Sequence, residues 1–265
     1  MRVAFTKMHG AGNDYVFVDG IAVPFPTERA GDVARAWSDR HFGIGADGLI
    51  VMVRSATAPV RMLMWNADGS RGAMCGNGLR CLARFAFDCG HLRETGFAIE
   101  TDVGLRGVEL LAGDLVRTSM GAVRCSAPVR VQLGARDLEV VPGDAGNPHA
   151  VVFVADTEAA DVLGIGALLQ RHVGFPGGVN VEFVQVLDGD RLRQRTFERG
   201  SGETLACGTG AAVAVIAARE RGWLRGDATI VELRGGELRV SGVATALAIE
   251  GPTRTVFRGE IALPE

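Results

Sequence analysis

Two short cysteine-glycine motifs, CGNG at Cys75–Gly78 and CGTG at Cys207–Gly210, decide how this chain is interpreted. Each motif is followed by an apolar segment, LRCLARFAF or AAVAVIAA, whose composition predicts a largely buried helix. The two motifs are about 130 residues apart. This spacing suggests that the chain contains two versions of one structural unit.

Two further motifs recur in the same order and at nearly the same spacing. AGN at residues 11–13 precedes DYVFVD, and AGN at residues 145–147 precedes PHAVVFVAD. A glycine-containing turn and apolar strand begin at His41 (HFGIGADGLIVMV) and again at His172 (HVGFPGGVNVEFVQV). Glycine turns alone recur by chance. Three ordered matches, however, predict an internal duplication.

The hydrophobic pattern predicts an α/β (α+β) fold with two similar units. The expected strands cover residues 3–8, 15–19, 49–53 and 60–65, then 149–154, 179–186 and 191–197. The expected outer helices cover residues 27–39 and 158–171, and the expected central helices cover 79–87 and 211–218. We expect each central helix to run through the middle of its own sheet.

We expect two domains, 1–118 and 119–253. Proline and charge around Ala127-Pro128 favour a linker in this part of the chain. The strand-like end of the chain, residues 254–265, is expected to pack on the first domain.

Composition excludes several classes of function. The 265 residues are 47% hydrophobic and 22% charged, which is typical of a globular protein. The net charge of −3 comes without a basic cluster, so we expect a small-molecule partner and neither nucleic acid nor membrane. The N-terminus does not resemble a secretory signal. Five cysteines without zinc-binding or CxxC spacing predict no metal site and reduced thiols in the cytoplasm.

The setting of Cys75 and Cys207 predicts acid/base chemistry. Unpaired N–H groups and the helix dipole at a helix N-terminus stabilise a thiolate. They therefore lower the pKa of a cysteine thiol below its unperturbed value of about 8.5. The same N–H groups bind a carboxylate. Duplication would place the two cysteines on opposite sides of one cleft. Removal of a proton from one face and delivery to the other inverts a stereocentre, so the pair predicts a cofactor-independent amino-acid racemase or epimerase.

Alternative interpretations of these motifs are weaker. A disulfide between Cys75 and Cys207 does not suit a cytoplasmic chain, and Cys81, Cys89 and Cys125 are expected to be structural because they have no repeat partner. GIGADG at residues 43–48 matches a dinucleotide fingerprint, but a helix is expected before it and a strand after it, so we interpret it as a turn. Markers of phosphoryl transfer, zinc hydrolysis and serine hydrolysis are absent from the sequence.

Longer motifs along nearly the whole chain resemble the diaminopimelate epimerase family. They are KMHGAGNDYVFVD, WNADGS, CGNGLRC, GNPHAV, VNVEFVQV and ERGSGETLACGTGA. The resemblance implies two pseudo-symmetric domains, each with a mixed, mostly antiparallel sheet wrapped around a central helix. It also implies interconversion of LL- and meso-diaminopimelate, in the synthesis of lysine and peptidoglycan precursors, without pyridoxal phosphate or metal.

The resemblance also assigns roles to individual residues. Cys75 and Cys207 match the acid/base cysteines, and His149 and Glu198 match positions that assist proton transfer. The matched substrate-binding positions are Asn13, Asn66, Gly76, Asn77, Asn147, Asn180, Glu198, Arg199, Gly208 and Thr209. Asparagine oxygens and Glu198 suit an ammonium group, and Arg199 suits a distal carboxylate. Turn formation beside glycine or proline is the alternative role for Asn13 and Asn147.

Two questions stay open at the level of sequence. Some family members have Gln where this chain has Gly48, so a contact from the side chain at this position to the substrate cannot form here. Alternative functions are a related two-cysteine proline or hydroxyproline racemase, and a non-catalytic amino-acid-binding module. A homodimer is also possible.

Overall fold

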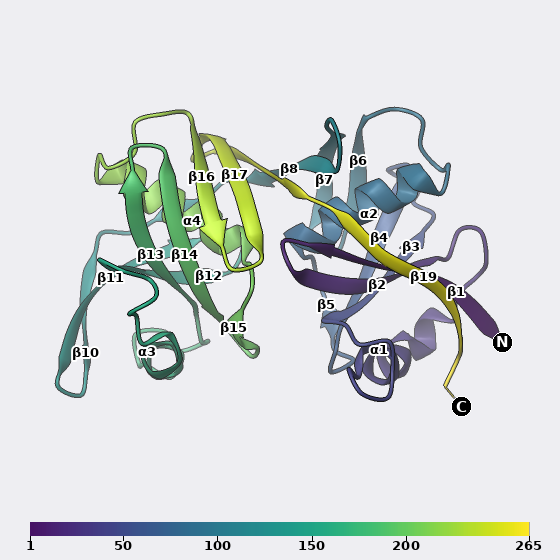
Figure 1. Ribbon diagram of the computed structural model, residues 1–265, viewed down its shortest axis with the longest axis horizontal. Coiled ribbons are helices and arrows are strands. Elements are labelled where there is room, and N and C mark those ends of the chain that lie inside the picture. The colour runs from purple at the N-terminus through teal and green to yellow at the C-terminus, as the bar shows by residue number, and fades with distance from the viewer. Residues whose placement is uncertain (265) are drawn as a thin grey trace. The chain divides into compact units, whose positions relative to one another are not determined.

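A computed structural model describes residues 1–264 (Figure 1). In these residues the chain is a mixed α+β protein, dominated by strands, with four α-helices and 19 strands. Residue contacts divide it into two compact units, Met1–Thr118 with the segment from Gly251 onward, and Ser119–Glu250. The boundaries between the units fall within two strands, β8 (Leu115–Gly121) and β18 (Ala246–Pro252).

The first unit contains α1 (Ala30–Ser38), preceded by a 3₁₀ turn at Thr27–Arg29, and α2 (Gly76–Asp88). Its strands are β1 (Arg2–Gly10), β2 (Asn13–Asp19), β3 (Gly48–Val53), β4 (Val60–Asn66), β5 (Arg71–Gly72), β6 (Gly96–Thr101), β7 (Gly104–Leu110) and the first part of β8, together with β19 (Arg254–Ala262).

The second unit contains α3 (Val162–Leu169) and α4 (Gly208–Glu220). Its strands are β9 (Arg124–Cys125), β10 (Val129–Leu133), β11 (Arg136–Asp144), β12 (Pro148–Phe153), β13 (Asn180–Asp188), β14 (Arg191–Glu198), β15 (Gly202–Thr204), β16 (Ala228–Leu233), β17 (Gly236–Val243) and β18 (Ala246–Pro252).

Strand pairing follows the same pattern in both units. In the first, β1 pairs antiparallel with β2, β2 parallel with β3, β3 antiparallel with β4, and β4 parallel with β6. In the second, β11, β12, β13, β14 and β16 pair with the same alternation of directions. The mixed, mostly antiparallel sheet that we predicted is therefore present. Parallel neighbours in this pattern are joined by long crossovers, one of which in each unit contains the helix after the cysteine motif.

The helices after the cysteine motifs are α2 and α4, and both are largely buried. In Figure 1, α2 lies against the sheet of its own unit, where it packs on β1 and β2, and α4 packs on β13 and β12. Residues 210–218 of α4 are all buried, as expected for a helix that is apolar on every face. No helix in residues 1–264 has the length and apolar character needed to cross a membrane.

The outer helices are shorter than the sequence pattern predicts. We expected α3 to begin near residue 158, but it begins at Val162. It begins there because the Asp161 side chain caps the helix by accepting a hydrogen bond from the Gly164 N–H at 3.0 Å. The expected helix at 27–39 is divided into the 3₁₀ turn and α1. The C-terminal strand forms as β19 and pairs antiparallel with β1. Glu265, the last residue of that predicted segment, lies outside the described residues.

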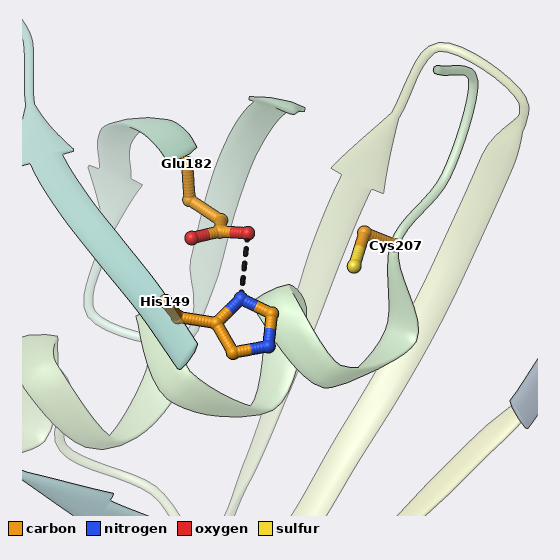
Figure 2. Close-up of side chains that lie close together, drawn as sticks. All are labelled: His149, Glu182 and Cys207. Atoms are coloured by element: carbon orange, nitrogen blue, oxygen red, sulfur yellow. Dashed lines mark hydrogen bonds and ion pairs between the residues drawn. The ribbon is translucent and has the colours of Figure 1, made fainter. Parts of the chain in front are cut away.

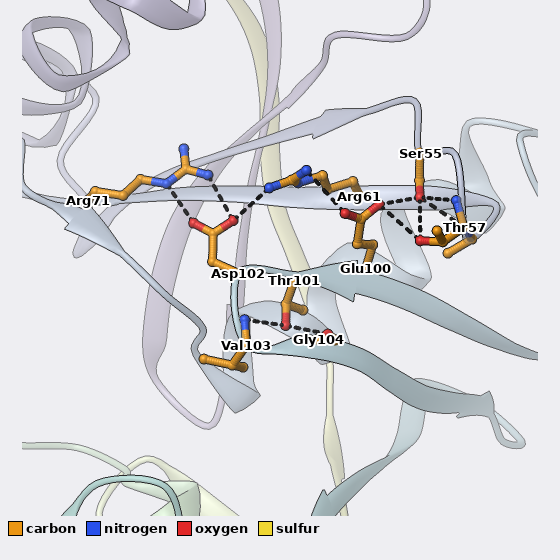
Figure 3. Close-up of polar contacts among 10 residues, drawn as sticks. Ser55, Thr57, Arg61, Arg71, Glu100, Thr101, Asp102, Val103 and Gly104 are labelled. Atoms are coloured by element: carbon orange, nitrogen blue, oxygen red, sulfur yellow. Dashed lines mark hydrogen bonds and ion pairs between the residues drawn. The ribbon is translucent and has the colours of Figure 1, made fainter.

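An ion pair on the sheet surface is also common to both units. In the first, Arg61 on β4 pairs with Glu100 on β6 at 3.1 Å, and Asp102 lies between Arg61 and Arg71 (Figure 3). In the second, Arg193 on β14 pairs with Glu232 on β16 at 2.9 Å. Each pair joins residues directly opposite in the parallel register.

Candidate active site

Cys75 and Cys207 occupy the same backbone position, the N-cap of α2 and of α4. Their dihedral angles are nearly equal, φ −131° and ψ 125° for Cys75 and φ −126° and ψ 109° for Cys207. Each sulfur accepts a hydrogen bond from the N–H three residues later, at 3.5 Å from Gly78 and 3.4 Å from Gly210. Both thiols therefore lie at the positive end of a helix dipole, which favours the thiolate.

The second glycine of each motif is required by a side chain from the neighbouring strand. A Cβ on Gly78 would lie 2.6 Å from Cδ1 of Ile50, and a Cβ on Gly210 would lie 2.4 Å from Oε1 of Glu182. Ile50 and Glu182 occupy the same position, the third residue of β3 and of β13. One space in the duplicated fold is thus filled by an aliphatic chain in the first unit and by a carboxylate in the second.

A hydrogen-bonded chain orients Asn13 beside Cys75. The Cys75 thiol donates to Oδ1 of Asn13 at 3.1 Å, and Asn77 donates to the same oxygen at 3.4 Å. The Asn13 amide NH₂ donates to Oδ2 of Asp47 at 2.6 Å, and Arg40 pairs with Oδ1 of Asp47 at 3.0 Å. Asp47 comes from the glycine-rich turn, which lies between α1 and β3 as we predicted. The turn therefore serves to fix the amide of Asn13.

Tyr15 and Arg80 complete the surroundings of Cys75. The buried Tyr15 hydroxyl is hydrogen-bonded to Cys75 and Asn13; burial, followed by the charge of Cys75, raises the pKa of Tyr15 well above its usual value. Arg80 on α2 is fully buried and interacts electrostatically with Cys75, although burial lowers the pKa of Arg80. Its Nη2 donates to Asn77. Its Nε and Nη1 have no hydrogen-bond partner within residues 1–264. A buried cation near Cys75 favours the thiolate.

Acidic and imidazole groups surround Cys207 instead. Figure 2 shows His149 on β12, with the Glu182 carboxylate and the Cys207 sulfur both directed toward its ring. His149 Nδ1 lies 2.9 Å from Glu182 Oε1, and His149 Nε2 lies 3.0 Å from Asn147 Oδ1. His149 and Glu182 are 1% and 0% exposed. Glu182 Oε2 has no hydrogen-bond partner in the described part of the chain.

These surroundings oppose ionisation of Cys207. Burial, followed by the negative charges of Glu198 and Glu182, raises the pKa of Cys207 well above its usual value, while hydrogen bonds from Thr209 and the Gly210 N–H lower it. The Thr209 hydroxyl lies 3.4 Å from the sulfur. A thiol whose ionisation is opposed in this way is suited to donate a proton.

The remaining predicted residues lie at the ends of strands. Asn66 and Glu198 end β4 and β14; Asn66 donates to Ser70 at 2.9 Å, and Glu198 accepts from Thr204 at 2.5 Å. Asn180 begins β13, and its side-chain oxygen accepts from the backbone N–H of Arg199 at 2.8 Å. The exposed Arg199 guanidinium donates to the carbonyl of Gly177 at 3.0 Å. Gly76 and Gly208 begin α2 and α4, with no bulky neighbour at the position of a Cβ on Gly76.

Sequence reasoning missed four residues of these two groups: Tyr15, Asp47, Arg80 and Glu182. A charged residue inside an otherwise apolar segment is the signal that marks Arg80 in LRCLARFAF and Glu182 in VNVEFVQV. Tyr15 and Asp47 carry no comparable signal. Their role depends on the pairing of β2 with β3, which places Tyr15 beside Gly48.

The other three cysteines differ from the catalytic candidates. Burial raises the pKa of Cys81 and of Cys125 to about 12, which fits the structural role that we predicted for them. We predicted a structural role for Cys89 as well, but it is exposed at the C-terminal end of α2, so it is not the small buried side chain that such a role implies. The helix ends there, which leaves the thiol beyond the packed face.

One group of side chains near Cys207 has the chemistry of a metal site. The ligand atoms of His149, Glu182 and Cys207 all lie within 4.8 Å of one another. Imidazole, carboxylate and thiolate are all zinc ligands.

The chain is similar to known proteins over almost its entire length. The family model described as diaminopimelate epimerase matches residues 5–126 and 143–251. A diaminopimelate epimerase of Geobacillus thermodenitrificans (strain NG80-2) is 42% identical over 96% of this chain and 95% of its own length. One from Azoarcus sp. (strain BH72) is 41% identical over 100% of both chains.

Solved structures resemble the fold at low sequence identity. A hydroxyproline epimerase from Agrobacterium vitis, with bound trans-4-hydroxy-L-proline, has a TM-score of 0.76 at 18% identity and covers 100% of this chain and 93% of its own. A Bacillus anthracis protein of the PhzF family has a TM-score of 0.76 at 16% identity, with 99% of each chain covered. These similarities concern the fold alone.

Proposed function

Because the chain belongs to the diaminopimelate epimerase family, we propose that it interconverts LL- and meso-diaminopimelate with Cys75 and Cys207 as the two acid/base groups. The observation that carries the assignment of these two residues is their shared N-cap position on duplicated helices, where each thiol accepts a hydrogen bond from the helix N-terminus.

The proposed reaction transfers one proton at each face of the α-carbon. Cys75, beside the buried Arg80, acts as a thiolate and removes the α-proton; Cys207, beside Glu182 and Glu198, acts as a thiol and supplies a proton to the opposite face. The reverse direction exchanges these roles. His149 and Glu198 assist the transfer at Cys207. The protein supplies all of this chemistry from its own side chains, without a cofactor.

Substrate recognition is proposed for the polar groups at the strand ends and helix starts. The N–H groups at the starts of α2 and α4 (Gly76 and Asn77, Gly208 and Thr209), at the positive ends of the helix dipoles, suit the α-carboxylate. Arg199 suits the distal carboxylate, and asparagine oxygens with Glu198 suit the ammonium groups. The asparagines proposed for binding are Asn13, Asn66, Asn147 and Asn180.

We also propose the assembly and location of the enzyme. Residues 1–118 and 119–253 form the two epimerase halves, and the C-terminal strand belongs with the first. A homodimer in the cytoplasm is proposed, where the five cysteines, which form no disulfide among the described residues, stay reduced.

Isotope exchange tests the proposed reaction. Reduced protein incubated with LL-diaminopimelate in heavy water is expected to form meso-diaminopimelate with deuterium at the α-carbon. Cys75→Ala and Cys207→Ala should each slow epimerisation by ~10²–10⁴-fold, the loss typical of a general acid or base. Cys89→Ala is the matched control and should retain full activity. Folded wild-type protein that exchanges no deuterium would contradict the proposal.

The specificity for a distal carboxylate is tested separately. Arg199→Ala should weaken activity on diaminopimelate, because it removes the proposed cation for the distal carboxylate. A related proline or hydroxyproline racemase activity would instead be unaffected by this change. Measurement of kcat/KM with diaminopimelate, proline and hydroxyproline distinguishes the two functions. A non-catalytic binding module would show no turnover with any of them.

A further inference from the structure

We propose that Cys207, His149 and Glu182 form an inhibitory binding site for a borderline divalent cation of the Zn²⁺ class. As an inhibitory site it rests on the proposed catalytic role of Cys207. The cation would not be a cofactor. It would bind the sulfur that has to carry the proton, and so would block the reaction.

The first support is the donor set and its geometry. The three ligand atoms lie within 4.8 Å of one another (Figure 2). Tetrahedral zinc with bonds of ~2.0–2.3 Å requires ligand separations of roughly 3.3–3.8 Å, so a shift of about 1 Å brings the sulfur into range. Nδ1 of His149 and Oε1 of Glu182 are 2.9 Å apart and need to separate by only about 0.4 Å to reach this range. A cation enters by replacing the proton that these two atoms share.

The second support is the hydrogen bond on the far side of the imidazole. With Nδ1 bound to a cation, the remaining ring proton is on Nε2, which lies 3.0 Å from the carbonyl oxygen of the Asn147 side chain. Metal-binding histidines characteristically donate their other N–H to such an oxygen, which fixes the ring orientation. The Asn147 oxygen is therefore already placed to accept the Nε2–H that a metal-bound His149 would carry.

The third support is electrostatic. The charged groups that act most strongly on the Cys207 thiol are Glu198 and Glu182, and both are anionic. Oε2 of Glu182 is buried and has no hydrogen-bond partner in residues 1–264. A divalent cation would satisfy this carboxylate and displace two protons: the S–H bond breaks as the S–metal bond forms, the proton shared by Nδ1 of His149 and Oε1 of Glu182 is released as these atoms bind the metal, and both H⁺ leave to solvent. Since a substrate must reach Cys207, a small cation can follow the same path.

The duplicated motif supplies an internal control. Cys75 has the same N-cap geometry as Cys207, but Tyr15 stands where the second unit has His149, and Ile50 stands where it has Glu182. The buried cation nearest in sequence, Arg80, repels a second cation. Cys75 is therefore predicted to bind divalent metals much more weakly than Cys207.

Cobalt absorption tests the site without reference to activity. Co²⁺ added to reduced, metal-free, full-length protein should produce sulfur-to-cobalt charge-transfer absorption. This absorption should persist in Cys75→Ser and disappear in Cys207→Ser. Glu182→Gln should weaken Co²⁺ binding roughly tenfold or more. Glu220→Gln, at the exposed far end of α4, removes the same charge and should leave binding unchanged. Absorption that survives Cys207→Ser, or is lost in Cys75→Ser, overturns the proposal, as does unchanged affinity in folded Glu182→Gln.

Zinc inhibition tests the functional consequence. Micromolar Zn²⁺ should abolish epimerisation by the wild-type protein, and a chelator should restore it. Cobalt binding without zinc inhibition would overturn the inhibitory role. Wild-type protein that fails to epimerise when free of metal would contradict the proposed function instead, while the cobalt spectra would still decide whether the metal site exists.

Discussion

The two cysteine loops of this molecule share a backbone and differ in charge. At Cys75 the neighbouring groups are an asparagine, a tyrosine, an isoleucine and a buried arginine: Asn13, Tyr15, Ile50 and Arg80. At Cys207 the corresponding groups are an asparagine, a histidine, a glutamate and an alanine: Asn147, His149, Glu182 and Ala212. The cation near the first thiol and the carboxylates near the second favour opposite proton states. The two units therefore share the geometry of the loop, and different side chains at a few equivalent positions make the two thiols unequal.

This difference explains how an acid and a base can coexist at neutral pH. Inversion needs one thiolate and one thiol at the same time, and two thiols in identical surroundings would have no preference for which of them ionises first. Distinct environments give two like groups different pKa values, and this difference assigns the acid and base roles. The helix N-termini act equally on both cysteines and therefore cannot make this distinction. The distinction between the two thiols comes from side chains on β3, β13 and α2.

Exchange of the paired residues Ile50 and Glu182 should have the largest effect on stability. Ile50→Glu buries a carboxylate that has no histidine beside it, and we expect it to cost about 3–5 kcal/mol of unfolding free energy. Glu182→Ile removes a buried carboxylate but leaves Nδ1 of His149 without its hydrogen-bond partner, at a cost of about 1–3 kcal/mol. Urea unfolding of both variants measures the difference. Equal losses of unfolding free energy would mean that the surroundings of Ile50 and Glu182 are not as distinct as their contacts indicate.

Removal of the buried guanidinium near Cys75 should have an intermediate effect. Arg80→Met loses the cation that favours the Cys75 thiolate, so we expect the acidic limb of the pH–rate profile to move to higher pH by about 1 unit, with roughly tenfold lower activity below it. Arg84→Met, on the same helix, is the control; its guanidinium donates to the carbonyl of Gly113. A profile of Arg80→Met that is lower at every pH but not displaced would show that Arg80 acts through packing alone.

The sequence predicted the backbone positions of the two cysteines better than the side chains that surround them. The cysteine motifs identified both helix starts because a cysteine before Gly-x-Gly is a local signal, readable without knowledge of the fold. Contacts such as Tyr15 beside Cys75 and Glu182 beside His149 were missed, because they depend on the register of parallel strands that are distant in sequence. The pairing of Asn13 with Asp47 was missed for the same reason.

The same reasoning explains which strands were overlooked. The strands that were predicted from sequence, such as β3 and β12, are apolar over several consecutive residues. Strands such as β7 and β17 have few buried residues, separated by polar or glycine positions, so their hydrophobic pattern is weak. Their position is determined by the neighbours with which they pair, and this information is not local.

The smallest effect is expected at the surface ion pair that both units retained. Hydrogen bonds from Arg193 and Arg191 lower the pKa of Glu232, despite an opposing contribution from burial. Because the folded-state pKa is below the unfolded value of about 4.3, the pair stabilises the protein fully above that pH and loses its effect as the pH falls through the folded-state pKa. The pair is partly solvent-screened, so Glu232→Gln should cost less than about 1 kcal/mol at pH 7.

Thermal unfolding at two pH values checks this, with Glu100→Gln as the matched variant in the first unit. Both variants should be slightly less stable than the parent at pH 7, and the deficit of Glu232→Gln should shrink toward zero as the pH is lowered below about 4. A deficit that stays constant with pH would mean that hydrogen bonding or packing, and not charge, is what the second unit gains from this carboxylate. The ion pair has the same residue types in both units, whereas the residues around the thiols differ in type. Similar small costs in the two variants would therefore place the functional divergence of the halves at the cysteine loops.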